Sequence, residues 1–152
     1  MLNEIIITLI LRGIPEAFIH MYAVYALANV KIDKKKYIGS SLVLAFLMVL
    51  ISKLPISYGI HTILVVMAII GLGVRFNQLD TIYCTSIAIM NMIIQFLAEG
   101  VNVVLIEKIL KMDIGKAMSN PLVKSIYGLP SLAIFFCVIW LIHRFIKKRR
   151  GE

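Results

Sequence analysis

Long stretches of almost uncharged sequence limit the possible folds of this chain more than any other feature. Examples are SLVLAFLMVLI at 41–51 and SLAIFFCVIWLI at 131–142, in a sequence that is 61% hydrophobic. Soluble domains hold about 45–50% apolar residues, and a more apolar chain cannot cover its surface with polar groups. Helices of about 20 apolar residues span a bilayer, and these runs lack the short alternating segments of a transmembrane barrel. The sequence therefore predicts an all-α, polytopic transmembrane helix bundle that forms one integral membrane domain over residues 1–152.

Five membrane spans are expected, separated by short polar or basic segments. A basic loop, KIDKKK at 31–36, follows the first span, and a polar segment at 107–125 precedes the last. The start of the sequence lacks the basic n-region and cleavage site of a secretory signal peptide, so we expect the first span to persist in the mature protein. The predicted spans cover residues 4–29, 38–54, 57–74, 80–107 and 126–146.

Lysine and arginine residues predict the orientation of the bundle, because basic loops stay on the cytoplasmic side of a membrane. With five alternating spans, ten basic residues fall on the side of the 31–36 loop and the C-terminal tail, and five fall on the other side. We therefore expect an outside N-terminus and a cytoplasmic C-terminus, in a multi-pass protein of the bacterial plasma membrane. The ten are Lys31, Lys34, Lys35, Lys36, Arg75, Arg144, Lys147, Lys148, Arg149 and Arg150, and the five are Lys53, Lys108, Lys111, Lys116 and Lys124.

The net charge of +8 does not indicate nucleic-acid binding, because the basic residues lie in short clusters beside apolar runs. Cys84 and Cys137 lie inside apolar runs, away from any histidine or cysteine at metal-ligand spacing, which indicates packing roles. We expect neither a metal nor a cofactor. The sequence has no HExxH or GxSxG motif and no Gly-rich phosphate loop, and Asp80 has no partner aspartate, so it predicts no enzyme.

Ionisable residues interrupt the first apolar segment within LRGIPEAFIH at 11–20. Arg12, Glu16 and His20 are spaced by four and share one helix face, so that Arg12 and Glu16 can pair. Such residues in a membrane helix usually face the protein interior or a water-filled cavity. Pro15 leaves a backbone carbonyl of the preceding turn unbonded, and Gly13 permits close approach, so we expect a kinked helix with one polar face turned inward.

A second polar stripe lies in the fourth span, within NMIIQFLAEGVN at 91–102. Asn91, Gln95, Glu99 and Asn102 are spaced by four, four and three, which again defines one helix face. The simplest arrangement packs this stripe against the first one. In the predicted topology Glu99 and Arg12 both lie toward the outer half of the membrane, so we expect them to meet.

Three roles are open for these stripes. Polar side chains in membrane helices often serve only as hydrogen bonds between helices, and an Arg–Glu pair can do no more than fix helix register. The stripes can instead line a cavity that contacts a ligand or senses protons, or a transport path. His20 alone is more typical of a satisfied core histidine than of a sensor.

The fourth apolar run is longer than a membrane requires. Residues 80–111 would form a helix of about 48 Å, whereas the hydrocarbon core is about 30 Å thick. This helix must tilt or extend beyond the bilayer. The segment EKILKMDIGKAM at 107–118 can lie along the outer surface as a lid over the stripes, with Gly115 and MSNP at 118–121 as hinge positions.

Three stretches resemble the membrane-embedded sensor modules of accessory-gene-regulator-type histidine kinases, a GHKL group found mostly in clostridia. They are RGIPEAFIHMYAVYALANVKIDKKKY at 12–37, IIQFLAEGVNVVLIE at 93–107 and NPLVKSIYGLPSLAIFFCVIWLIHRFIKKRR at 120–150. In such modules a Gly–Leu–Pro turn opens the last span and a basic stop follows, and Gly128, Leu129 and Pro130 match that turn. The resemblance implies a receptor for an exported signal, often a small peptide. The sequence shows no ATP site, and it has five expected spans where such receptors usually have six or seven. The resemblance therefore implies a freestanding module without kinase activity.

We therefore expect a small sensor or receptor-like module in the lipid bilayer for an extracellular peptide or small molecule. It would act through a membrane protein partner or as a homo-oligomer. Two other classes stay open, a substrate-capturing subunit of a small transporter and a structural partner in a membrane assembly. Neighbouring genes would separate them, since a peptide precursor with its protease indicates a receptor and a pair of ATPases indicates transport.

Overall fold

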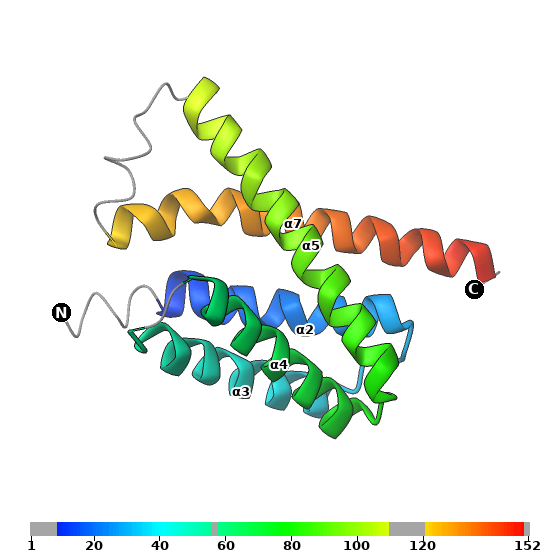
Figure 1. The fold of residues 1–152 in the computed structure, drawn as a ribbon. Coiled ribbons are helices and arrows are strands. Elements are labelled where there is room, and N and C mark those ends of the chain that lie inside the picture. The colour runs from blue at the N-terminus through cyan, green and yellow to red at the C-terminus, as the bar shows by residue number, and fades with distance from the viewer. Residues whose placement is uncertain (1–8, 56–57, 110–120, 151–152) are drawn as a thin grey trace.

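The computed structural model describes residues 9–55, 58–109 and 121–150, and it confirms the predicted all-α, polytopic helix bundle. No strand occurs in these three ranges. A π-helical turn opens the described chain and five α-helices follow it (Figure 1). These elements are η1 (Leu9–Gly13), α2 (Ile14–Ala28), α3 (Lys34–Ser52), α4 (Tyr58–Asn77), α5 (Thr81–Ile109) and α7 (Pro121–Arg150).

The bundle is apolar on the outside and partly polar on the inside, the reverse of a soluble helix bundle. Large apolar side chains such as Phe46, Leu97 and Phe145 are exposed, whereas His20 and Asn91 are buried. Exposed apolar surface of this extent would associate in water, and a bilayer covers it. The chain is therefore an integral membrane protein whose helices present apolar faces to lipid and keep polar groups for contacts with one another.

Four helical segments of the described chain are long and apolar enough to cross a membrane: Lys34–Ser52, Gly59–Asn77, Thr81–Lys108 and Ile126–Arg149. With 15 residues, α2 alone is shorter than a bilayer requires. The π-helical turn η1 directly precedes it, so the helical segment begins at Leu9. The predicted first span at 4–29 is thus described only from residue 9 onward.

Consecutive helices alternate in direction, so the bundle has two chemically different ends (Figure 1). We call one the basic end: it holds the α2–α3 connection, the α4–α5 connection and the C-terminus of α7. The other, the Arg12 end, holds η1 and the start of α7. The predicted grouping of the 31–36 segment with the C-terminal basic cluster is present. The basic end carries Lys31, Lys34, Lys35, Lys36, Arg75, Arg144, Lys147, Lys148 and Arg149.

Helix α2 lies at the centre of the bundle and contacts each of the other four α-helices. Its residues Ala17 and Ala23 have no exposed surface, and such small side chains let membrane helices approach closely. One apolar cluster joins α2 to α3, α4 and α5 around Leu44 and Ile69. A second cluster joins α2 to α5 and α7 around Phe135.

Short-range hydrogen bonds fix where the helices begin and end at the basic end. Asp33 Oδ1 accepts from the backbone N–H of Lys35 at 3.0 Å, which caps α3. Asp80 Oδ2 accepts from the backbone N–H of Ile82 at 3.0 Å and so caps α5. Asn29 ends α2 in the left-handed conformation, with φ 51°.

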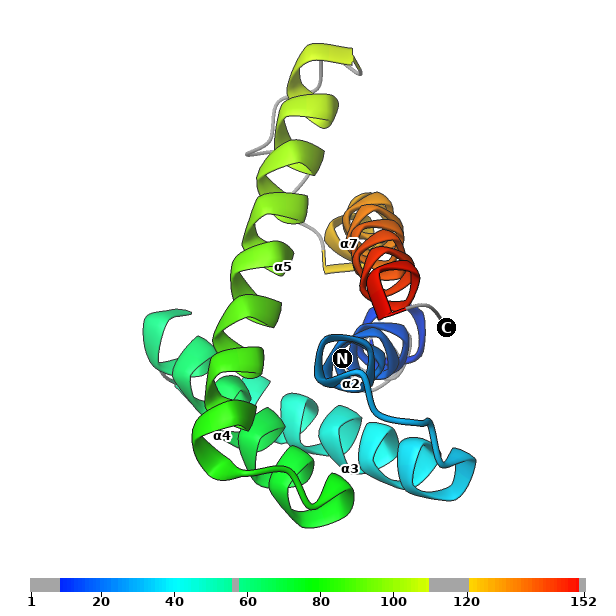
Figure 2. The same cartoon turned by 90° about the vertical axis from the view of Figure 1, so that its right-hand side faces the viewer.

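Helix α5 is longer than the membrane requires, as its sequence predicts. Its 29 residues extend over about 43 Å at 1.5 Å per residue, against a hydrocarbon core of about 30 Å. It crosses the other helices obliquely, and its far end extends past them (Figure 2). The predicted lid at 107–118 lies mostly outside the described residues, which exclude 110–120. The predicted hinge position Gly115 lies in this excluded range as well.

Two predicted boundaries are wrong. The 31–36 segment is not a loop throughout, because the cap at Asp33 starts α3 at Lys34, four residues before the predicted span. The predicted turn at Gly128, Leu129 and Pro130 is absent, because α7 runs unbroken from Pro121 with Pro130 inside it. Proline is tolerated inside membrane helices, and beside Pro130 the Ser131 Oγ donates to the Gly128 carbonyl at 2.7 Å.

The irregularity expected around Pro15 takes the form of a change in helix type. The π-helical turn ends at Gly13, and α2 begins with Pro15 in its first turn. Proline is tolerated in the first turn of a helix. The turn leaves Arg12 at the junction between η1 and α2.

Candidate functional site: a charged cluster between α2, α5 and α7

Arg12 pairs with two carboxylates that come from different helices. Its Nη2 lies 2.9 Å from Glu99 Oε1 on α5, and its Nε lies 3.4 Å from Glu16 Oε2 one turn along α2. The Arg12 and Glu16 side chains are 22% and 15% exposed, while Glu99 is 37% exposed. The predicted meeting of Arg12 with Glu99 is therefore present, and the group is only partly closed off from its surroundings.

Helix α7 forms the third wall of this group through Gly128. A methyl group at position 128 would lie 2.5 Å from Arg12 Nη1 and 3.0 Å from its Cζ. No residue larger than glycine fits there while the guanidinium holds its present place. The glycine expected to form a turn instead makes room for the Arg12 side chain.

His20 and Asn91 form the deepest polar contact of the group. His20 is 1% exposed, and its Nδ1 lies 3.2 Å from Asn91 Oδ1. The Asn91 amide nitrogen donates to the His20 backbone carbonyl at 3.2 Å, which leaves the amide oxygen as the acceptor for the ring. The amide oxygen of Asn91 thus faces Nδ1, and the other ring nitrogen, Nε2, lies 3.9 Å from Glu16 Oε1.

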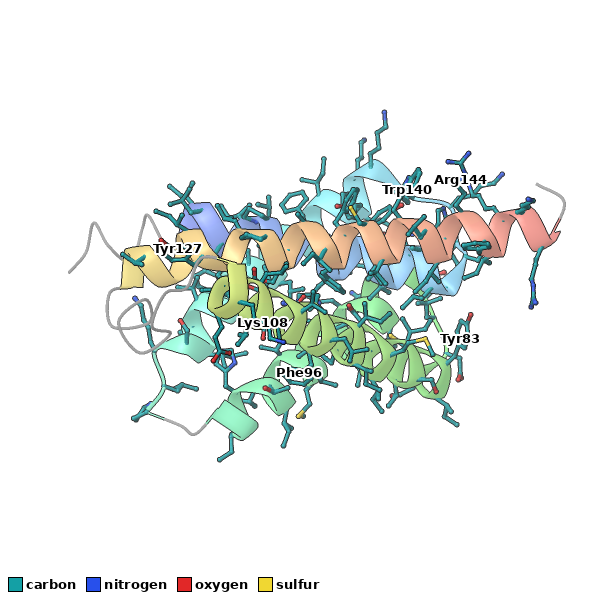
Figure 3. The ribbon with its side chains drawn as sticks, turned by 90° about the horizontal axis from the view of Figure 1, so that it is seen from above. Tyr83, Phe96, Lys108, Tyr127, Trp140 and Arg144 are labelled. Carbon is teal, nitrogen blue, oxygen red and sulfur yellow. The ribbon has the colours of Figure 1, made fainter. Side chains whose placement is uncertain are left out.

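Two further amides of α5 continue the stripe toward the Arg12 end. Gln95 Nε2 donates to Glu99 Oε1 at 3.2 Å, while Gln95 Oε1 is buried without a hydrogen-bond partner. Asn102 Nδ2 donates to the backbone carbonyl of Tyr127 on α7 at 2.7 Å. Figure 3 shows Tyr127 at the opposite end of α7 from Trp140 and Arg144.

The predicted stripe residues thus lie at one interface, where α2 and α5 meet and α7 closes the side. We call Arg12, Glu16, His20, Gln95 and Glu99 the Arg12 cluster. The cluster has two carboxylates, Glu16 and Glu99, and one guanidinium, so its negative acceptors outnumber its positive donors. That arrangement suits a cationic or hydrogen-bond-donating group better than an anion. Among the described residues no group of three or more histidine, cysteine, aspartate or glutamate side chains could hold a metal ion.

Sequence reasoning missed His143, a contact between α7 and α2 at the basic end. Its Nδ1 lies 3.3 Å from the Ala26 backbone carbonyl, and its ring packs edge-on against Tyr22. The available signal was a histidine inside an apolar span next to the basic stop. Helix α7 therefore touches α2 both beside Arg12 and at the far end of α2.

The fold and this interface define the class: a multi-pass helical membrane protein with an intramembrane charged cluster. Comparison with protein-family models, with curated proteins and with solved structures finds no match.

Proposed function

We propose that this chain is a receptor-like membrane protein in which an external ligand acts on the Arg12 cluster and a membrane protein partner responds at the basic end. The contact of Arg12 with Glu99 carries the proposal. It joins segments 87 residues apart through charged groups that remain partly exposed. Ionisable groups are costly inside a membrane and commonly mark functional positions, and the exposure of Glu99 leaves its carboxylate within reach of a ligand.

Helix α7 offers a physical route between the two ends. It holds Gly128 against the Arg12 guanidinium and places His143 against the Ala26 carbonyl. These two contacts are about 22 Å apart along one helix, at 1.5 Å per residue. A ligand that draws Glu99 or Arg12 away from its partner would release the Gly128 end of α7 and change how its basic end meets α2.

Charge and resemblance both support an outward-facing cluster. The basic end would be cytoplasmic under the positive-inside rule, which puts the Arg12 end outside. The likeness of residues 12–37, 93–107 and 120–150 to sensor modules of peptide-responsive kinases points to the same role. A small peptide amine would match the surplus of acceptors in the cluster.

The test measures the position of the basic end of α7 in variants of the Arg12 cluster. Spin labels at Lys108→Cys and Lys147→Cys, in a Cys137→Ala background, report the distance between α5 and the end of α7 in nanodiscs; Cys84 is buried and stays. Glu99→Gln removes one charge with little change in shape. Glu107→Gln is the matched control, because Glu107 is an exposed carboxylate on the same helix.

The probe is the peptide fraction of the source organism's culture medium, added at the outer face. We expect this fraction to shift the label distance in the wild type and in the control variant but not in Glu99→Gln. If it shifts Glu99→Gln equally, or leaves the wild type unchanged, the cluster is not a ligand site and its contacts serve helix packing.

A further inference from the structure

A small polar hollow opens at the basic end, far from the Arg12 cluster. Its volume is about 90 Å³, on the order of three water molecules. Its walls come from α2, α3, α4 and the α2–α3 connection. The residues that line it are Tyr25, Val30, Lys31, Asp33, Lys36 and Asn77.

The deepest wall of this hollow carries polar atoms without partners. Tyr25 is 2% exposed, and its hydroxyl forms no hydrogen bond. The buried amide nitrogen and oxygen of Asn77 form none either, and this amide lies beside the Tyr25 hydroxyl. Buried polar groups in proteins are nearly always satisfied, so these atoms indicate an occupant.

The charges around the hollow identify the chemistry of that occupant. Lys31 and Lys36 are among its lining residues and each carries a positive charge, while the Tyr25 hydroxyl and the Asn77 amide are neutral donors. Asp33 also lines the hollow and its Oδ1 accepts from the start of α3, so the two lysines leave the lining with a net charge of +1. Two lysines and two neutral donors in the lining of a space of this size suit one tetrahedral oxyanion.

The position of the hollow adds the source of the oxyanion. It lies where α2 ends and α3 begins, at the point where the apolar surface gives way to the lysines of 31–36. Lipid phosphates lie at that level of a bilayer, and basic pockets between membrane helices bind anionic headgroups. The free Asn77 carbonyl oxygen can accept from a headgroup hydroxyl.

We propose that this hollow, the Tyr25 site, binds the phosphate of an anionic phospholipid headgroup such as phosphatidylglycerol. A free phosphate ion shares this chemistry, so the test separates the two sources. The proposal is independent of the ligand role proposed for the Arg12 cluster.

Native mass spectrometry of the full-length protein in detergent tests the site, with phosphatidylglycerol and phosphatidylcholine titrated separately. We expect one saturable phosphatidylglycerol site that is at least about tenfold tighter than phosphatidylcholine. Lys31→Gln/Lys36→Gln should weaken it by about tenfold or more, since each lysine near an anionic headgroup contributes substantially. Lys35→Gln/Lys148→Gln removes the same charge from the same end without touching the lining, and it should stay within about twofold of wild type.

Asn77→Leu removes the buried amide and should also weaken binding, with all lysines kept. Inorganic phosphate is the second probe: displacement of phosphatidylglycerol by millimolar phosphate would support the oxyanion site and assign it to a soluble ion. Two results would overturn the proposal. One is an equal loss in both double-lysine variants, which would mean diffuse surface attraction; the other is equal affinity for the two lipids with no effect of phosphate.

Discussion

Replacing Arg12 should be the most destabilising single change in the charged cluster. Arg12→Met leaves Glu16 and Glu99 without their cation and beside each other. At 2.9 Å the attraction between Arg12 and Glu99 is about 5–6 kcal/mol with an effective dielectric constant of 20, and desolvation of both ions offsets most of it. Removing one partner of a fully buried pair costs about 3–5 kcal/mol. Since Arg12 is 22% and Glu99 37% exposed, we expect a smaller loss, about 2–3 kcal/mol.

The double variant Arg12→Met/Glu99→Gln tests whether this loss comes from an unpaired charge. It removes one positive and one negative charge, so a single carboxylate remains, beside the buried His20. We expect it to be more stable than the sum of the single variants predicts, by about 1.5–2 kcal/mol. The melting temperature of Arg12→Met should fall by about 5–10 °C, and that of the double variant by less than the added shifts.

A buried thiol provides the assay. Cys84 has no exposed surface, whereas Cys137 is exposed. In a Cys137→Ala background, a thiol-reactive dye therefore reports the exposure of Cys84 as the solubilised protein unfolds. Glu107→Gln should melt like the parent. If the losses of the two single variants simply add in the double variant, Arg12 and Glu99 do not stabilise each other and our account of the cluster fails.

Three further outcomes follow from close contacts and from the basic end. Gly73→Ala should destabilise by about 1–3 kcal/mol, because its methyl would overlap the buried sulfur of Cys84 on α5. Its melting is followed by circular dichroism, since Cys84 is the reporter of the thiol assay. Gly71→Ala meets open space and should be neutral. Gly128→Ala should lower the melting temperature in the parent but much less in an Arg12→Met background, because its methyl displaces the guanidinium; equal losses in both would refute that contact. A cysteine at Lys35 should resist a membrane-impermeant reagent added outside intact cells and react after permeabilisation; labelling from outside would reverse the proposed orientation.

The meeting of the two polar stripes could be predicted because two simple regularities determine it. A spacing of three or four fixes which face of a helix a side chain occupies, and this placed Arg12 with Glu16, and Gln95 with Glu99. Alternating spans fix roughly how deep each residue lies, and this placed Arg12 and Glu99 in the same half of the membrane. A costly charge then favours the nearest opposite charge at that depth.

Other contacts could not be predicted, because they depend on how closely particular helices approach. Gly128 with Pro130 has the composition of a turn, yet this segment is helical and Gly128 packs against the Arg12 guanidinium. The Tyr25 site joins Tyr25 with Asn77, 52 residues apart in the sequence, and neither lies in a polar stripe. Only the crossing of α2, α3 and α4 brings those side chains together.

The distribution of polar contacts indicates which helices can move. Lipid provides no hydrophobic force between helices, so specific packing and hydrogen bonds decide their arrangement. Helix α5 is joined to the α2 segment by charged and amide pairs, Arg12 with Glu99 and His20 with Asn91. Helix α3 is held differently, by apolar packing and by Tyr37, whose hydroxyl donates to a backbone carbonyl of α2 at 3.0 Å. A change of charge at the cluster therefore alters the α5 contact and leaves the α3 contact intact. We expect any response to displace α5 and α7 against a fixed unit of α2, α3 and α4.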